Sequence, residues 1–170
     1  AYRRQRQMCI RDRLTIVSAA HVYYEKKVID IELLRHNIST LARQFPKTKG
    51  THGEMVVSHY HVTGAREHAC EAFPQLFAQW LPFFGNCATD PYRFHKTLLF
   101  IMSSLNDTNV FYRGGEKAVK ETKERSGILL KNFTLDGLEA MNRWMIQENI
   151  SPGGSADMLS LTAFIHSLQY

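Results

Sequence analysis

The chain has 170 residues and a formal net charge of +5, with 44% apolar and 22% charged residues, 10 glycines and 5 prolines. This composition is typical of one globular domain and excludes disordered, collagen-like and disulfide-scaffold proteins. The longest apolar run, Leu98–Met102, is far shorter than the roughly 18 residues that a membrane-spanning helix needs, and the three cysteines lie far apart. We therefore expect a reduced, cytoplasmic chain with no membrane partner.

The positive charge is concentrated at the beginning of the chain. Of the 21 basic and 16 acidic residues, segment 1–13 holds five arginines and one aspartate, which leaves 16 basic and 15 acidic residues over 14–170. No basic face can be recognised in that nearly neutral body, so we expect no nucleic-acid partner.

Segment 1–13 could be a nucleic-acid arm, a targeting segment or foreign sequence, although it lacks the apolar stretch of a signal peptide. Residues Gln7–Arg13 resemble translated sequencing-adapter sequence, and position 1 is not methionine. We predict that 1–13 is a non-native leader, with a solvated natural arm as the alternative. Residues 14–170 then form the C-terminal part of one domain whose N-terminal part is missing.

Apolar residues recur at helical spacing and strand-like alternation is absent, so we predict an all-α multi-helix bundle, incomplete at its N-terminal side. The first predicted helices cover 14–27, Asp30 to a break at Pro46–Gly50, a capping box at Thr51–Glu54 to about His61, and Phe73 to before Pro82. Of the remaining predicted helices, one starts at Asp90-Pro91, one passes through Leu135–Met145, and the last starts at about Ser155. A polar loop over 106–115 and a charged segment over 116–125 lie between the first two of these helices. The last helix is apolar on most sides, which predicts a central place in the bundle.

Two polar segments with paired glycines, Asn106–Gly115 and Ser151–Asp157, separate strongly apolar helices. Paired glycines let a backbone approach a ligand, a helix N-terminus offers N–H groups to an anion, and Arg113 has the planar guanidinium that grips phosphate. Asp107 and Asp157 would repel a phosphate unless they hold a divalent cation, most commonly Mg²⁺. The second segment is also a good helix-to-helix turn with Ser155 as its cap, so a structural interpretation stays open there.

A third polar segment, Val62–Ala69, contains Arg66, which could bind a phosphate or pair with Glu67 or Glu71 on the surface. None of the eight histidines forms a zinc-binding pattern. The sequence also lacks a Walker loop, a dinucleotide-binding glycine pattern and a nucleophile elbow.

Together these segments resemble the triphosphoribosyl-dephospho-CoA synthase family, which makes the prosthetic-group precursor of citrate lyase or malonate decarboxylase. Family members carry a D-D-T-N…R-G-G segment, matched by Asn106–Asn109 and Arg113–Gly115, and an S-P-G-G-S-A-D-L-L-A-L-T segment, matched from Ser151. They also carry a T-x-G-E…G-A-R-G-E-A…G-F-P segment, matched by Thr51, Gly53, Glu54, Thr63–Arg66, Ala69 and Phe73-Pro74. The resemblance covers roughly residues 14–170.

The chain departs from the family pattern at several positions. Asn106 replaces the first family aspartate, Tyr112 a histidine, Glu67-His68 a Gly-Glu pair, and Ala72 a glycine. The P-K-P-G-L-V-D and N-T-H-K-G segments of the family's N-terminal portion do not occur in this sequence.

The resemblance implies an all-α pentosyltransferase that uses ATP as its sugar donor. In that reaction the 2′-hydroxyl of 3′-dephospho-CoA displaces adenine at the ribose carbon of ATP, and the product passes to a holo-acyl-carrier-protein synthase step. Mg²⁺ would neutralise the triphosphate, and a base would accept the hydroxyl proton. The implied site residues are Asp107 and Asp157 as catalytic or metal-binding carboxylates, Asn109 as orienting residue, and Arg113, Gly114, Gly115, Gly153, Gly154, Ser155 and Arg66 on phosphate.

Three hypotheses follow: a C-terminal fragment of this transferase with impaired turnover, a non-catalytic helical module that binds nucleotide or dephospho-CoA, and a nucleic-acid-binding helical protein that depends on the basic leader. Under the first, we expect the two glycine-containing segments to converge at one rim of the bundle. Asp107 and Asp157 would then lie close enough to share a cation.

Overall fold

The computed structural model describes residues 10–26, 29–44 and 52–169, and within them the chain is all-α, as predicted. No helix in this part is long and apolar enough to cross a membrane. The elements are α1 (Ile10–Lys26), α2 (Ile31–Gln44), α3 (His52–Tyr60), α4 (Ala65–Cys70), the π-helical turn η1 (Leu76–Trp80), α5 (Leu81–Asn86), α6 (Arg93–Ser104), α7 (Thr108–Lys131), α8 (Leu135–Gln147) and α9 (Gly153–Ser167).

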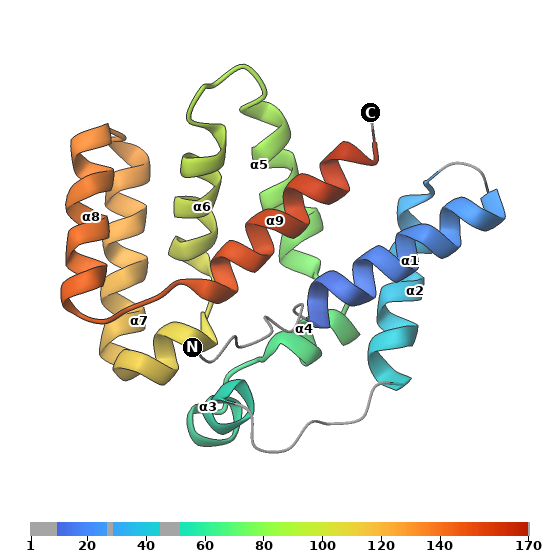
Figure 1. Ribbon diagram of the computed structural model, residues 1–170, viewed down its shortest axis with the longest axis horizontal. Helices are drawn as coiled ribbons and strands as arrows, with labels where there is room; N and C mark the ends of the chain where they lie inside the picture. Colours follow the sequence, from blue (N-terminus) through green and yellow to red (C-terminus); the bar gives the residue numbers. More distant parts are fainter. Residues whose placement is uncertain (1–9, 27–28, 45–51, 170) are drawn as a thin grey trace, which may run out of the picture.

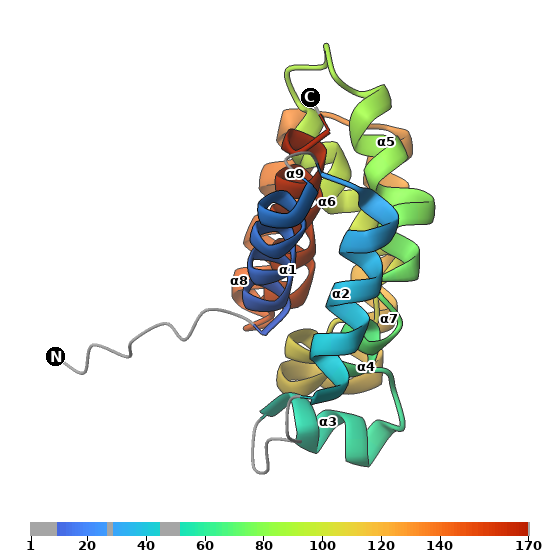
Figure 2. The same ribbon diagram turned by 90° about the vertical axis from the view of Figure 1, so that its right-hand side faces the viewer.

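Helix α9 crosses the middle of the bundle, as its apolar character predicts (Figure 1). It packs against α1, α5, α6 and α7. The α7–α8 pair lies on one side of it and the α1–α2 pair on the other, while α3 closes one end (Figures 1 and 2).

Two hydrophobic clusters form the core, and α6 contributes to both. The first cluster includes Val22, Leu34, Ile38, Trp80, Ile101, Leu105, Met158, Leu161 and Ile165. The second includes Val56, Leu99, Met102, Val110, Phe111, Met141, Met145 and Ile150. Two of the places at which the chain passes from one cluster to the other lie between Leu105 and Val110 and between Ile150 and Met158.

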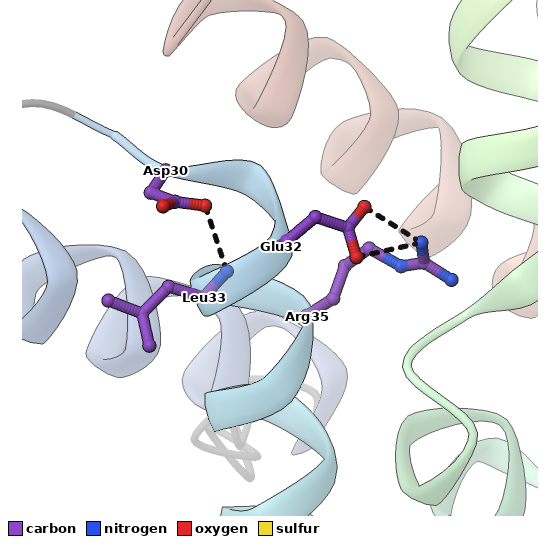
Figure 3. Close-up of polar contacts among 4 residues, drawn as sticks. All are labelled: Asp30, Glu32, Leu33 and Arg35. Carbon is purple, nitrogen blue, oxygen red and sulfur yellow. Dashed lines mark hydrogen bonds and ion pairs between the residues drawn. The ribbon is translucent and has the colours of Figure 1, made fainter.

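Local capping signals in the sequence explain several helix starts. Asp30 caps α2 as predicted, since its Oδ1 accepts a hydrogen bond from the N–H of Leu33 at 3.0 Å (Figure 3). Arg35, one turn along, pairs with Glu32 at 3.1 Å. At α8, the Thr134 hydroxyl accepts from the N–H of Gly137 at 3.1 Å.

The structure corrects the predicted loop over 106–115. Helix α7 begins at Thr108, so most of this segment is helical, because Asp107 supplies a side-chain cap. The last helix likewise begins at Gly153 rather than at Ser155.

Two further helix boundaries differ from the predictions. Helix α5 runs from Leu81 through Pro82, which the first turn of a helix tolerates. Helix α1 begins at Ile10, so the last four residues of the predicted leader are helical. The predicted break at Pro46–Gly50, and Thr51 of the capping box, lie outside the described residues.

Candidate functional site

Asp107 joins the two glycine-containing segments. It is only 4% exposed, and its carboxylate accepts four hydrogen bonds. Oδ1 accepts from the backbone N–H groups of Asn109 at 2.9 Å and Gly154 at 3.3 Å. Oδ2 accepts from the N–H of Ser155 at 2.7 Å and from its hydroxyl at 2.9 Å. The predicted convergence of the two segments is therefore confirmed.

The paired glycines of the second segment lie directly against the first segment. A Cβ on Gly153 would lie 2.6 Å from Nδ2 of Asn109, and a Cβ on Gly154 would lie 2.9 Å from Oδ1 of Asp107. Both separations are shorter than a carbon can make without displacing its neighbour. Glycine at these positions thus allows α9 to approach the start of α7.

Arg113 makes a second link between the same segments. Its Nη1 donates to Oδ1 of Asn149 at 2.9 Å and approaches the Asn149 carbonyl at 3.4 Å. Asn149 has a φ of 52°, a left-handed conformation that asparagine tolerates better than most residues. Arg113 is otherwise an exposed residue at this rim.

Gly114 and Gly115 form a bend in α7. Gly115 has φ 67° and ψ −165°, a conformation open to glycine alone, and a Cβ there would lie 3.3 Å from the Tyr60 hydroxyl. A Cβ on Gly114 would collide with that of Ala118. The bend turns the short first part of α7, which carries Arg113, away from the axis of the longer second part.

Asp157 lies one turn into α9, half-buried, and makes no hydrogen bond or ion pair with another described residue. Two residues along an α-helix correspond to a rotation of about 200°. Because Ser155 points at Asp107, Asp157 faces a different side of α9. Within the described part of the chain, no three His, Cys, Asp or Glu side chains are grouped to hold a metal ion.

Helix α3, whose first turn contains Gly53, also lies at this end of the bundle. A Cβ on Gly53 would lie 3.9 Å from Oγ1 of Thr108, which places the start of α3 beside the start of α7. Arg66 lies in α4, which packs against α1 and α2, and its half-buried side chain is engaged within the protein.

Sequence reasoning missed Lys123, which sits in the charged segment and carries no local signal. Its Nζ donates to Oδ1 of Asn106 at 2.7 Å, next to Asp107 in the chain. Burial lowers the pKa of this ammonium group. Sequence reasoning also missed the roles of Asn149 and Tyr60, since only the folded chain brings them to Arg113 and Gly115.

Comparisons with known proteins give a consistent picture. The sequence model of the family described as ATP:dephospho-CoA triphosphoribosyl transferase matches residues 1–170. A 2-(5″-triphosphoribosyl)-3′-dephosphocoenzyme-A synthase of Haemophilus ducreyi is 35% identical over 128 residues, which are 71% of this chain and 39% of the relative. No solved structure matches the chain significantly.

Two further relatives are named as probable enzymes of the same kind. The protein of Streptococcus mutans is 32% identical over 128 residues, 70% of this chain and 43% of the relative. That of Streptococcus equi subsp. equi is 35% identical over 132 residues, 72% of this chain and 45% of the relative. The chain thus spans less than half the length of these relatives.

Proposed function

Because the chain belongs to the ATP:dephospho-CoA triphosphoribosyl transferase family, we propose that it carries part of the site for that transfer. The 2′-hydroxyl oxygen of 3′-dephospho-CoA forms a bond to C1′ of the ATP ribose while the bond from C1′ to adenine breaks. The hydroxyl proton goes to a base, and adenine leaves with the electron pair of the broken bond. The observation that carries this proposal is that two segments 47 residues apart meet at Asp107.

Arg113 and Asn109 are both exposed residues of the first of these segments. In this proposal the Arg113 guanidinium, oriented by Asn149, binds the triphosphate with the N–H groups that have no partner among the described residues. Asn109 orients the ribose, and Gly114 and Gly115 give the backbone bend that presents Arg113. Arg66 is proposed as a further phosphate-binding residue.

Gly153 lies in the first turn of α9, and the N–H groups in the first turn of a helix can bind an anion. In this proposal Gly153 therefore contributes to phosphate binding. The N–H groups of Gly154 and Ser155 already donate to Asp107, so their part in the site is to hold Asp107.

Mg²⁺ would neutralise the triphosphate, and Asp157 is the carboxylate of the predicted pair that suits it. Mg²⁺ in nucleotide sites is bound by one or two carboxylates together with phosphate oxygens. Asp157 has no hydrogen-bond partner among the residues that the structure describes, whereas the four hydrogen bonds to Asp107 occupy about as many lone pairs as a carboxylate offers. Asp157 therefore remains open either to the cation or to the proton of the attacking hydroxyl.

The wider setting follows from the same reaction. A cytoplasmic location would give access to ATP and 3′-dephospho-CoA. The product carries a triphosphate, so an acyl-carrier-protein synthase step that transfers the group with loss of pyrophosphate would consume it.

ATP titration calorimetry in the presence of Mg²⁺ tests the binding part of the proposal. Replacing Arg113 by alanine should lower ATP affinity roughly 10- to 100-fold, the value of a hydrogen bond to a charged group. Arg143→Ala is the matched control, because Arg143 is exposed on α8 and pairs only with Glu139 among the described residues. Equal affinities in the two variants would contradict the assignment of Arg113.

Adenine release from ATP with 3′-dephospho-CoA tests the chemistry. We expect little turnover from this chain alone, because an incomplete site cannot orient the reacting atoms. ATP binding without adenine release would favour a binding module, a candidate supported by the chain spanning 39–45% of its relatives. Robust release would contradict the incomplete-site argument.

A further inference from the structure

The strongest unassigned feature is the position of the Asp107 carboxylate between two helix N-termini and two hydrophobic clusters. Its chain neighbours Leu105 and Val110 belong to different clusters. The same is true of Ile150 and Met158, which flank the segment that donates to it. Asp107 thus links two of the places at which the chain passes between the clusters.

Helix α9 receives its N-terminal cap from Asp107. Its own N-cap residue, Pro152, has no side-chain acceptor and makes no capping hydrogen bond. The first N–H groups of a helix need acceptors, and a carboxylate there also interacts favourably with the helix dipole. Asp107 supplies this acceptor to Gly154 and Ser155 while it caps α7 through Asn109.

The glycine pair fits the same interpretation. The space that a side chain of Gly154 would need is occupied by the Asp107 carboxylate, and the space next to Gly153 is occupied by the Asn109 amide. These glycines are therefore accounted for by the packing of α9 against the start of α7.

We propose that Asp107 is a positioning residue: a shared N-cap of α7 and α9 that sets Asn109 and Arg113 against the segment leading into α9. This assignment rests on the proposed function only for the identity of the ligand, ATP. It differs from direct metal binding by Asp107, which is the competing outcome of the test below.

Thermal unfolding in EDTA separates these two roles. As a shared cap, Asp107 stabilises the metal-free protein, so Asp107→Asn should lower its Tm by roughly 5–10 °C, and Ser155→Ala, which loses one of the four bonds, by roughly 2–4 °C. A metal ligand buried without its cation would be destabilising, so Asp107→Asn would then leave Tm unchanged or raise it. Either of those results overturns the proposal.

ATP affinity, measured well below every Tm, separates positioning from mere stability. Ser155→Ala keeps all three backbone donors to Asp107 and should fold. We expect Ser155→Ala to weaken ATP binding several-fold. Arg113→Ala should then lower ATP affinity by a smaller factor in the Ser155→Ala background than in the wild-type chain. Fully additive effects of the two substitutions would overturn the positioning role.

Asp30→Ala is the matched control, because it removes another aspartate N-cap at the start of α2 (Figure 3). It should lower Tm and leave ATP affinity unchanged; an equal loss of affinity would mean that binding follows general stability. If wild-type protein binds no ATP although Asp107→Asn lowers Tm in EDTA, the proposed function fails while the shared cap stands.

Discussion

Arg93 and His166 lock α6 to the end of α9. The Nη2 of Arg93 lies 2.9 Å from Nε2 of His166, and because a guanidinium can only donate, Nε2 accepts and the imidazole is neutral. Arg93 also donates through Nε to the Phe84 carbonyl at 2.7 Å and lies 3.5 Å from the centre of the Phe84 ring. The contact holds α5, α6 and α9 together at the end of α9 remote from its Asp107 cap.

This contact predicts a loss of stability in mild acid. Burial and then the Arg93 charge lower the pKa of His166 below its ordinary value near 6.5. The unfolded chain therefore binds this proton at a higher pH than the folded chain does. The stabilisation is present above pH 6.5 and is lost as the pH falls through the lowered folded pKa.

Urea unfolding at pH 7.5 and pH 5.0 measures this effect. His166→Gln should show a smaller drop in the free energy of unfolding between the two pH values than the wild-type chain. His36→Gln, at an exposed position on α2, should leave the drop unchanged. Equal pH dependence in wild type and His166→Gln would contradict the prediction.

A methyl group at Gly154 should disrupt the contact between α7 and α9. Gly154→Ala places a carbon 2.9 Å from a buried carboxylate oxygen and should reduce the free energy of unfolding by about 2 kcal/mol or more. Gly127→Ala is the comparison, since its Cβ would lie 3.9 Å from that of Ser103. Because alanine is favoured over glycine inside a helix, Gly127→Ala should raise the free energy of unfolding by roughly 0.5–1 kcal/mol. Chemical denaturation of both variants measures whether the free energy of unfolding falls in Gly154→Ala and rises in Gly127→Ala.

Gly115 should resist replacement by every other residue. Its φ of 67° would suit asparagine if ψ were near 45°, but ψ is −165°. Gly115→Asn and Gly115→Ala should therefore both cost about 1–3 kcal/mol of unfolding free energy. Rescue by asparagine relative to alanine would show that this backbone relaxes to the ordinary left-handed region.

Residues 1–13 are predicted to be dispensable for folding. Helix α1 begins at Ile10, and its described buried side chains are Thr15, Ser18, Ala19 and Val22. Deletion of 1–13 should therefore change Tm by no more than roughly 2 °C, which corresponds to less than about 1 kcal/mol for a chain of this size. A fall of several degrees would show that the segment packs on the domain.

Local sequence signals were sufficient for much of the fold. The spacing of Leu138, Met141 and Met145 predicted α8, and Asp30 predicted the start of α2, because helix periodicity and capping act over three or four residues. The same short segments, among them Arg113–Gly115, indicated the family to which the chain belongs.

The roles of the polar residues depended on contacts that only the tertiary structure makes. From the sequence, Asp107 and Asp157 looked like an equivalent pair of carboxylates. In the folded chain Asp107 is buried with four donors, while Asp157 lies on another side of α9. A carboxylate's role depends on which donors reach it, and those on Ser155 come from 48 residues away. The packing of α7 against α9 brings Ser155 to Asp107, and no sequence pattern of three or four residues encodes that contact.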